Sequence, residues 1–396
     1  MSSLERSGVE GEATALSTHH RGGAGHDLGK RSPLYYVDWL RVLLVSLVVA
    51  HHAAQAYGPT GRRWPVFEAE RTNLLGPFFS VNAAFFMGFF FMISGYFVAG
   101  SLARKGSIRF LRDRLIRLGL PPLIFGFGFF AVVGYAFSGE TSGFWSYYLA
   151  TYIGEWDVEF GPLWFVLHLL AYSIVYVLLA AVFPKLTAPG SAPPPTFASI
   201  LALVAAIWIV GGLARSAYPQ DTWVNLLGFI PAEPAHMPQY VLMFAAGTIA
   251  GRNGWCVTLP HRTGSLWLTI GLTAALGWYA VRYLRDFAGL DLLRDVPIGI
   301  VFPLWEAVVC VGLSVGLLVY GRQHWSVPSK WLARLGPAAY GVFLIHIFVV
   351  VGFNFALLAL PLGPFVKFLI VTALSLTVSF AVIIALRQIP IVARVI

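Results

Sequence analysis

Residues 35–57 read YYVDWLRVLLVSLVVAHHAAQAY, an apolar run with two charged residues near its start and two histidines near its end. A membrane-spanning helix needs about 20 mostly apolar residues, and this run is long enough to form one. Charged groups inside a span are costly and are functional candidates by default. The stretch therefore predicts a transmembrane helix that carries a polar site within it.

Similar apolar runs recur along the rest of the 396-residue chain, which is 58% hydrophobic and only 11% charged, with a mean hydropathy of +0.73. A soluble domain has roughly 25% charged residues, so this composition excludes an ordinary soluble enzyme. The runs are continuous rather than alternating, which favours helices over a membrane barrel. We expect an all-α, polytopic integral membrane protein with about ten transmembrane helices. The nine further spans are predicted at about 77–101, 118–137, 161–183, 197–215, 238–251, 265–284, 298–321, 338–360 and 363–388.

The charge distribution predicts how the chain is oriented. With the N-terminus inside, eighteen of the 27 Lys and Arg residues fall in inner segments and seven in outer loops. Because inner loops carry the excess of basic residues, both termini are expected to be cytoplasmic. Residues 1–33 are polar with no apolar core, so we expect a disordered cytoplasmic tail before a membrane domain at 34–390. The excess of positive charge is therefore expected on the cytoplasmic side of the membrane. This favours the lipid bilayer of the cell membrane as a partner and disfavours nucleic acid.

The first predicted helix carries a polar stripe. Arg41 and His52 are 11 residues apart, which places them about 20° from a shared face and roughly 16 Å apart along the axis. Asp38 and Gln55 fall within about 40° of the same line, whereas His51 points about 80° away. The stripe predicts an internal polar cavity, and the alternative is an interfacial Asp and Arg pair with two histidines near the outer end.

The second concentration of charge is the basic loop at 102–117. Arg114 and Arg117 are three residues apart before Pro121 and Pro122, so both guanidinium groups can face one anion. A phosphate site is one interpretation, and anchoring to anionic lipid is the other.

Further polar residues lie inside or beside apolar runs. Ser94 is either a packing residue or a nucleophile, and Trp164 belongs either to a sugar-binding surface or to an interfacial aromatic belt. Glu306 is a functional candidate, while functional and structural roles stay open for His346. No two histidines stand at i, i+3 or i, i+4 on one helix, so we expect no metal site. Two glycine pairs, Gly247 with Gly251 and Gly312 with Gly316, predict close helix contacts.

Five motifs in order resemble the acyltransferase-3 superfamily of integral membrane acyltransferases, over Tyr35 to about residue 388. The most specific is Asp38-Trp39-Leu40-Arg41, followed by ten intervening residues and then His52. The supporting segments are Phe90 to Tyr96, the Arg114 and Arg117 pair before prolines, Gly161-Pro162-Leu163-Trp164-Phe165, and Leu335-Gly336 with Tyr340 to His346. One departure is His168, which stands where some relatives that acylate peptidoglycan or lipopolysaccharide have acidic residues.

The resemblance implies an enzyme that transfers an acyl group, not an amino-acyl group, from cytoplasmic acyl-CoA to a hydroxyl of a carbohydrate or related small molecule at the outer face. Acetyl-CoA is the expected donor substrate, with no tightly bound cofactor. Carried over by position, His52, Arg41 and Asp38 are the catalytic candidates, and Arg114 and Arg117 would bind the CoA phosphates. The expected substrate contacts are Trp164, Glu306, Tyr340, His346 and Ser94. The alternative function is a transporter or flippase, which would also explain ten helices with charges inside the membrane.

Overall fold

A computed structural model describes residues 34–59 and 64–396 of the chain, and the expected tail at 1–33 lies outside the described residues. The described part is mostly α-helical, and its β1(Val224–Leu226) and β2(Ile230–Ala232) strands pair as an antiparallel hairpin. This confirms the all-α prediction.

The helices follow one another along the chain. In chain order the α-helices are α1(Tyr35–Ala54), α2(Gly76–Lys105), α3(Ser107–Arg114), α4(Leu120–Ile124), α5(Phe130–Ser138), α6(Phe144–Tyr147), α7(Trp164–Val182), α8(Phe197–Ala217), α9(Met237–Asn253), α10(Trp255–Thr258), α11(His261–Ala288), α12(Ile298–His324), α13(Lys330–Ala356), α14(Pro364–Leu386) and α15(Pro390–Val395). The short 3-10 and π-helical elements are η1(Asn73–Leu75), η2(Leu115–Gly119), η3(Phe125–Phe129), η4(Tyr148–Ile153), η5(Gly161–Leu163) and η6(Pro184–Leu186).

Within the described residues, nine helices are long and apolar enough to cross a membrane, which confirms a polytopic membrane protein. The predicted third span is one continuous helical segment over 107–138, in which the π-helical turns η2 and η3 interrupt the α-helix. The predicted sixth span is α9, which has 17 residues and is shorter than the helices of the other predicted spans. It forms an unbroken helix that packs lengthwise against α2. The orientation of the termini remains a prediction.

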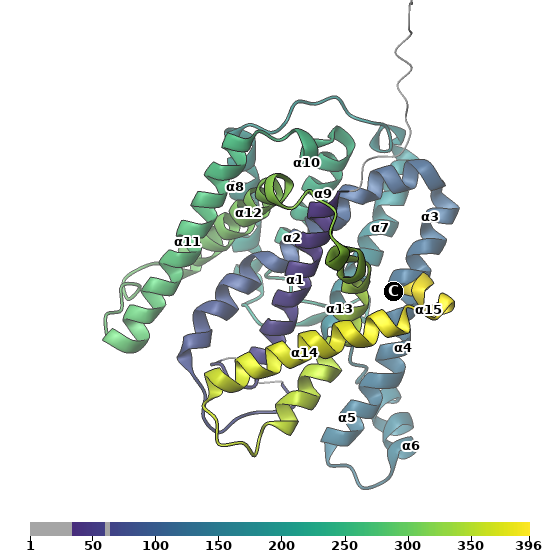
Figure 1. The fold of residues 1–396 in the computed structure, drawn as a ribbon, viewed down its shortest axis with the longest axis vertical. Helices are drawn as coiled ribbons and strands as arrows, with labels where there is room; N and C mark the ends of the chain where they lie inside the picture. The colour runs from purple at the N-terminus through teal and green to yellow at the C-terminus, as the bar shows by residue number, and fades with distance from the viewer. Residues whose placement is uncertain (1–33, 60–63) are drawn as a thin grey trace, which may run out of the picture. The chain divides into compact units, whose positions relative to one another are not determined.

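Helix α1 is surrounded by other helices. It packs against α2, α12, α13 and α14, and the ribbon view shows it within the bundle (Figure 1). Eleven of its residues are buried, including Leu40, Leu44 and Val48. Because neighbouring helices cover it on several sides, its polar residues meet protein groups rather than lipid alone.

Glycines let α2 approach α9, and α11 approach α12, at backbone distance. A Cβ atom added to Gly251 would lie 2.0 Å from the Tyr96 carbonyl oxygen, and one added to Gly247 would lie 2.1 Å from that of Met92. Gly312 and Gly316 make the equivalent approach to α11. The two predicted glycine pairs are therefore helix-contact sites, because only glycine leaves room for the facing backbone.

We expect Gly251→Val to destabilise the protein strongly. Overpacking a well-packed core typically costs about 1–3 kcal/mol, and here the obstacle is backbone rather than a movable side chain. Thermal unfolding of the detergent-purified protein would measure the loss. Gly277→Val is the matched control in α11, because nothing lies within 4 Å of a Cβ at that position. Equal unfolding temperatures for the two variants would contradict the packing account.

Candidate active site

Two histidines from distant parts of the chain meet at the end of α1. His346 Nε2, from α13, lies 3.2 Å from His52 Nδ1. His52 Nδ1 also lies 2.9 Å from the carbonyl oxygen of Val48, one turn earlier in α1. His346 Nδ1 lies 2.7 Å from the carbonyl oxygen of Phe343. The predicted stripe residue His52 and the separately predicted His346 therefore form a pair.

The partners of this pair define where the protons lie when both rings are neutral. A carbonyl oxygen can only accept, so His346 Nδ1 carries the proton that it donates to Phe343. His346 Nε2 is then an acceptor, and the proton between the rings belongs to His52 Nδ1, which shares it with the Val48 carbonyl. His52 Nε2 is left unprotonated, and it forms no hydrogen bond within the described part of the chain. This is the arrangement that a general base requires.

Three residues that sequence reasoning missed form a hydrogen-bonded chain that begins beside His52. The Trp64 ring centroid is 5.7 Å from that of His52. Trp64 Nε1 donates to Asn354 Oδ1 at 3.1 Å, and Asn354 Nδ2 donates to the Tyr57 hydroxyl at 3.1 Å. Asn354 could have been singled out as an amide inside an apolar run, whereas Trp64 lies in a loop with no pattern to mark it. These contacts hold the Trp64 ring beside His52.

Arg41 and Asp38 form an ion pair near the other end of α1. Arg41 Nη1 donates to Asp38 Oδ1 at 2.9 Å, and the guanidinium lies 4.9 Å from the centroid of the Phe97 ring. Gly336 of α13 packs so closely on Asp38 that an added Cβ would lie 3.2 Å from the Asp38 Cβ. The pair is thus held against α2 and α13.

Arg114 and Arg117 approach Arg41 although they come from a different segment. The three guanidinium groups are close enough to repel one another electrostatically. Asp38 bonds Arg41, and Asp113 bonds Lys105, so neither Arg114 nor Arg117 forms an ion pair with an acidic residue in the described chain. The result is a local excess of positive charge with free donors, which suits a phosphate-bearing ligand.

Tyr340 fixes the turn that carries these arginines. Its hydroxyl, from α13, donates to the main-chain carbonyl oxygen of Arg117. In an α-helix this carbonyl would accept from residue 121, and in a π-helical turn from residue 122. Both are prolines, which have no N–H to donate, so Tyr340 supplies the missing donor. Its predicted role as a substrate contact stays a prediction.

The arginine cluster predicts a phosphate-bearing substrate, and for such a substrate we expect Tyr340→Phe to raise the KM about 2- to 13-fold, since a net hydrogen bond is worth roughly 0.5–1.5 kcal/mol. The turnover number should change little, because the hydroxyl positions Arg117 rather than a reacting atom. Initial-rate kinetics at varied substrate concentration would measure both constants. Tyr320→Phe is the control, because within the described chain the Tyr320 hydroxyl forms no hydrogen bond. A fall in turnover with unchanged KM would contradict the positioning role.

Two of the predicted substrate contacts lie elsewhere. Trp164 stacks on Tyr240 with ring centroids 5.4 Å apart, and it meets His168 edge-on. His168 in turn pairs with the Pro231 carbonyl at 3.0 Å, so it anchors the β-hairpin. Ser94 is half-buried in α2 and forms no hydrogen bond within the described residues. The structure does not join these residues to the His52 pair.

Glu306 belongs to a separate buried network of four charged groups. It pairs with Arg215 of α8, and its Oε1 lies 3.2 Å from His236 Nε2. His236 Nδ1 lies 2.7 Å from Glu233 Oε2. Burial lowers the pKa of His236, but its hydrogen bonds to the two carboxylates outweigh burial and raise that pKa to about 10. The network is therefore charge-balanced and ties α8, α12 and the segment before α9 together. The role of Glu306 as a substrate contact stays a prediction.

Comparison with known protein families yields a match over most of the chain. Residues 34–384 match the family model described as an acyltransferase domain. No curated protein and no solved structure matches the chain. The matched range includes the histidine pair and the arginine cluster.

Proposed function

The chain belongs to the acyltransferase-3 family of membrane acyltransferases, and on that premise we propose that it moves an acyl group, expected to be acetyl, from cytoplasmic acyl-CoA to a hydroxyl at the outer face. The observation that carries this proposal is the His52 and His346 pair, because it leaves an unprotonated ring nitrogen beside a membrane-embedded polar stripe.

The proposed reaction begins with the acceptor hydroxyl at His52. His52 Nε2 takes the hydroxyl proton as the acceptor oxygen attacks the thioester carbonyl carbon. The carbon–sulfur bond then breaks, and the CoA sulfur takes the proton back from the His52 imidazolium. His346 Nε2 accepts from His52 Nδ1–H throughout, so it orients the ring and stabilises the charge that forms on it.

The arginine cluster supports a donor site at the opposite end of α1. Arg41 lies with Arg114 and Arg117 rather than with His52, and the rise between Arg41 and His52 is roughly 16 Å. This separation favours phosphate binding by Arg41 over stabilisation of the oxyanion at His52. The extended pantetheine arm of CoA would cover the distance between the phosphates and the thioester.

The remaining parts of the proposal rest on other grounds. Family membership favours an enzyme over the transporter or flippase alternative. A carbohydrate or related small molecule as acceptor rests on the family resemblance alone. Transfer through an acyl-Ser94 intermediate is the competing mechanism, and it predicts a trapped acyl-enzyme when acceptor is withheld.

The experiment uses purified protein in sealed vesicles, with acetyl-CoA added on one side and a panel of sugars on the other. We expect acceptor-dependent release of the CoA thiol and acetylated sugar in the acceptor compartment. A cysteine placed at the exposed position of Ile108 should be labelled from the donor side only, and one at the exposed position of Trp145 from the acceptor side only. Sugar movement without thiol release would instead support the transporter, and labelling of residue 108 from the acceptor side would refute the donor site.

A further inference from the structure

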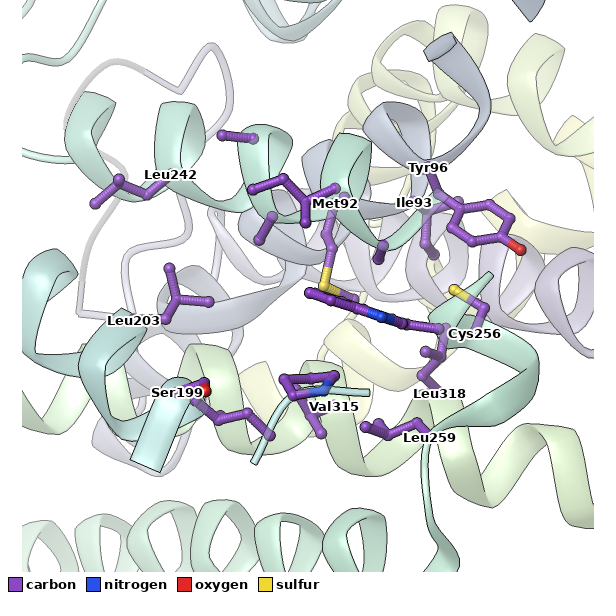
Figure 2. A pocket seen from close by; sticks show the side chains of 18 of the residues that line it. Met92, Ile93, Tyr96, Ser199, Leu203, Leu242, Cys256, Leu259, Val315 and Leu318 are labelled. Atoms are coloured by element: carbon purple, nitrogen blue, oxygen red, sulfur yellow. The ribbon is translucent and has the colours of Figure 1, made fainter. Parts of the chain in front are cut away.

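An apolar cavity of about 330 Å³ lies beside α1, away from the histidine pair. Figure 2 shows Met92, Tyr96, Cys256 and Leu318 around it, with Leu203 and Ser199 of α8 on another side. Its walls come from α1, α2, α8, α9, α10 and α12. At about 30 Å³ for each water molecule in the liquid, the space would hold several waters, yet an apolar cavity stays dry.

The polar groups in the wall are already paired. The Tyr96 hydroxyl bonds the Cys256 thiol, Trp255 Nε1 donates to the Ala192 carbonyl at 3.0 Å, and the Ser199 hydroxyl lies 3.0 Å from that of Thr196. A sugar, a nucleotide or a pantetheine arm would lose its hydrogen bonds to water here and gain none from these groups. The occupant that fits is therefore a hydrocarbon.

The cavity reaches the lipid-facing surface between α8 and α9. Ile249 lines the cavity and is 45% exposed, and Ser199 on the facing helix is also exposed. Helix α8 is one of the most apolar spans, and little of it is buried inside the protein. In a membrane the medium at this opening is lipid hydrocarbon, so a chain can enter sideways without crossing water.

The position of the cavity identifies the source of the chain. Val37, one of its wall residues, precedes His52 by 15 residues in α1, a rise of roughly 22 Å. An acyl group held here would lie far from the base that we assign to its transfer. Phe97, by contrast, both lines the cavity and carries the Arg41 guanidinium on its ring.

We infer that this cavity binds one hydrocarbon tail of a bilayer lipid, drawn from the membrane leaflet on the Arg41 side. The bound tail packs against Phe97 and so supports the residue on which Arg41 rests. The site depends on the membrane location of the protein and not on the proposed reaction.

The test uses the full-length protein in vesicles of phosphatidylethanolamine and phosphatidylglycerol. These contain a phosphatidylcholine with a diazirine at the end of one acyl chain. After irradiation, mass spectrometry locates the crosslinked residues. We expect crosslinks on the buried wall residues Ile93, Tyr96 and Cys256 as well as on exposed faces. Labelling confined to exposed residues such as Leu201 and Val241 would overturn the inference.

A matched pair of variants tests whether the cavity itself is responsible. Leu203→Trp fills the cavity from α8 and should abolish the deep crosslinks, whereas Leu201→Trp, on the exposed face of α8, should leave them. If Leu203→Trp does not fold, Ala246→Leu narrows the cavity from α9 with a smaller change. Deep crosslinks that survive filling would refute the site. Deep crosslinks from a diazirine-bearing long-chain acyl-CoA but not from the lipid would also refute it, because the donor would then be the occupant.

Discussion

Replacing His52 with Ala is expected to lower the rate of acyl transfer by about 10²–10⁴-fold, the usual contribution of a general base. The loss should fall on turnover, since the arginine cluster that we assign to the donor lies at the other end of α1. Acyl-CoA binding and the unfolding temperature should stay close to those of the native protein. Single-turnover measurement of thiol release, together with a separate donor-binding assay, would distinguish the two effects.

The neighbouring histidine is the matched control for this prediction. His51 packs edge-on against Phe79 with ring centroids 5.0 Å apart and also contacts Phe86, so it points to α2 and not to His346. His51→Ala should therefore keep most activity. If His51→Ala were inactive and His52→Ala active, the assignment of the base and of the stripe would both be wrong.

Substitution of His346 provides a second test of the proposed mechanism. His346→Ala should lower turnover on its own, because His52 then loses the group that orients its ring. Adding His346→Ala to His52→Ala should cost little more, since residues that act as a unit are far from additive. If the fold-losses in turnover of the two single variants instead multiplied in the double variant, the two histidines would act independently. That result would contradict the proposed mechanism.

Replacing both Arg114 and Arg117 with Ala is expected to raise the KM for acyl-CoA by about 10- to 150-fold for each arginine, since a hydrogen bond to a charged group is worth roughly 1.5–3 kcal/mol. Turnover at saturating donor should be largely retained, because neither residue reaches His52. The native enzyme should also lose donor affinity as salt rises, and the double variant should lose less. Initial rates at several salt concentrations would measure both effects.

A second pair of arginines on the same segment controls for total charge. Arg109 and Arg112 are exposed on α3, and neither joins the cluster around Arg41. Arg109→Ala with Arg112→Ala removes the same charge from the same helix and should leave the KM for acyl-CoA nearly unchanged. If both pairs of substitutions changed the KM for acyl-CoA equally, the phosphate site would be refuted. Arg114 and Arg117 would then be interpreted as general anchors to anionic lipid.

Most of the fold was predictable because a membrane helix is specified locally. Each span is an apolar run of sufficient length, and lipid leaves its backbone no other hydrogen-bonding partner than itself. The glycine pairs also predicted helix contacts from the sequence, because small residues four positions apart allow two helix backbones to approach closely. The apolar run predicts that the third span begins at residue 118, but the helical segment begins at Ser107. Basic residues lower the hydropathy of the segment before 118, yet they are compatible with a helix.

That Arg41 and His52 share one face of one helix follows from their spacing alone, because the helical repeat sets which residues align along the helix. The groups that these two side chains contact depend on how distant helices pack together. His346 lies 294 residues from His52, and Tyr340 lies 223 residues from Arg117. Contacts at such separations depend on which helices pack together, and that choice is made by side-chain packing along whole helices rather than by any local pattern. Helix packing also places Glu306 in contact with Arg215 and His236. No spacing in the sequence indicates that network.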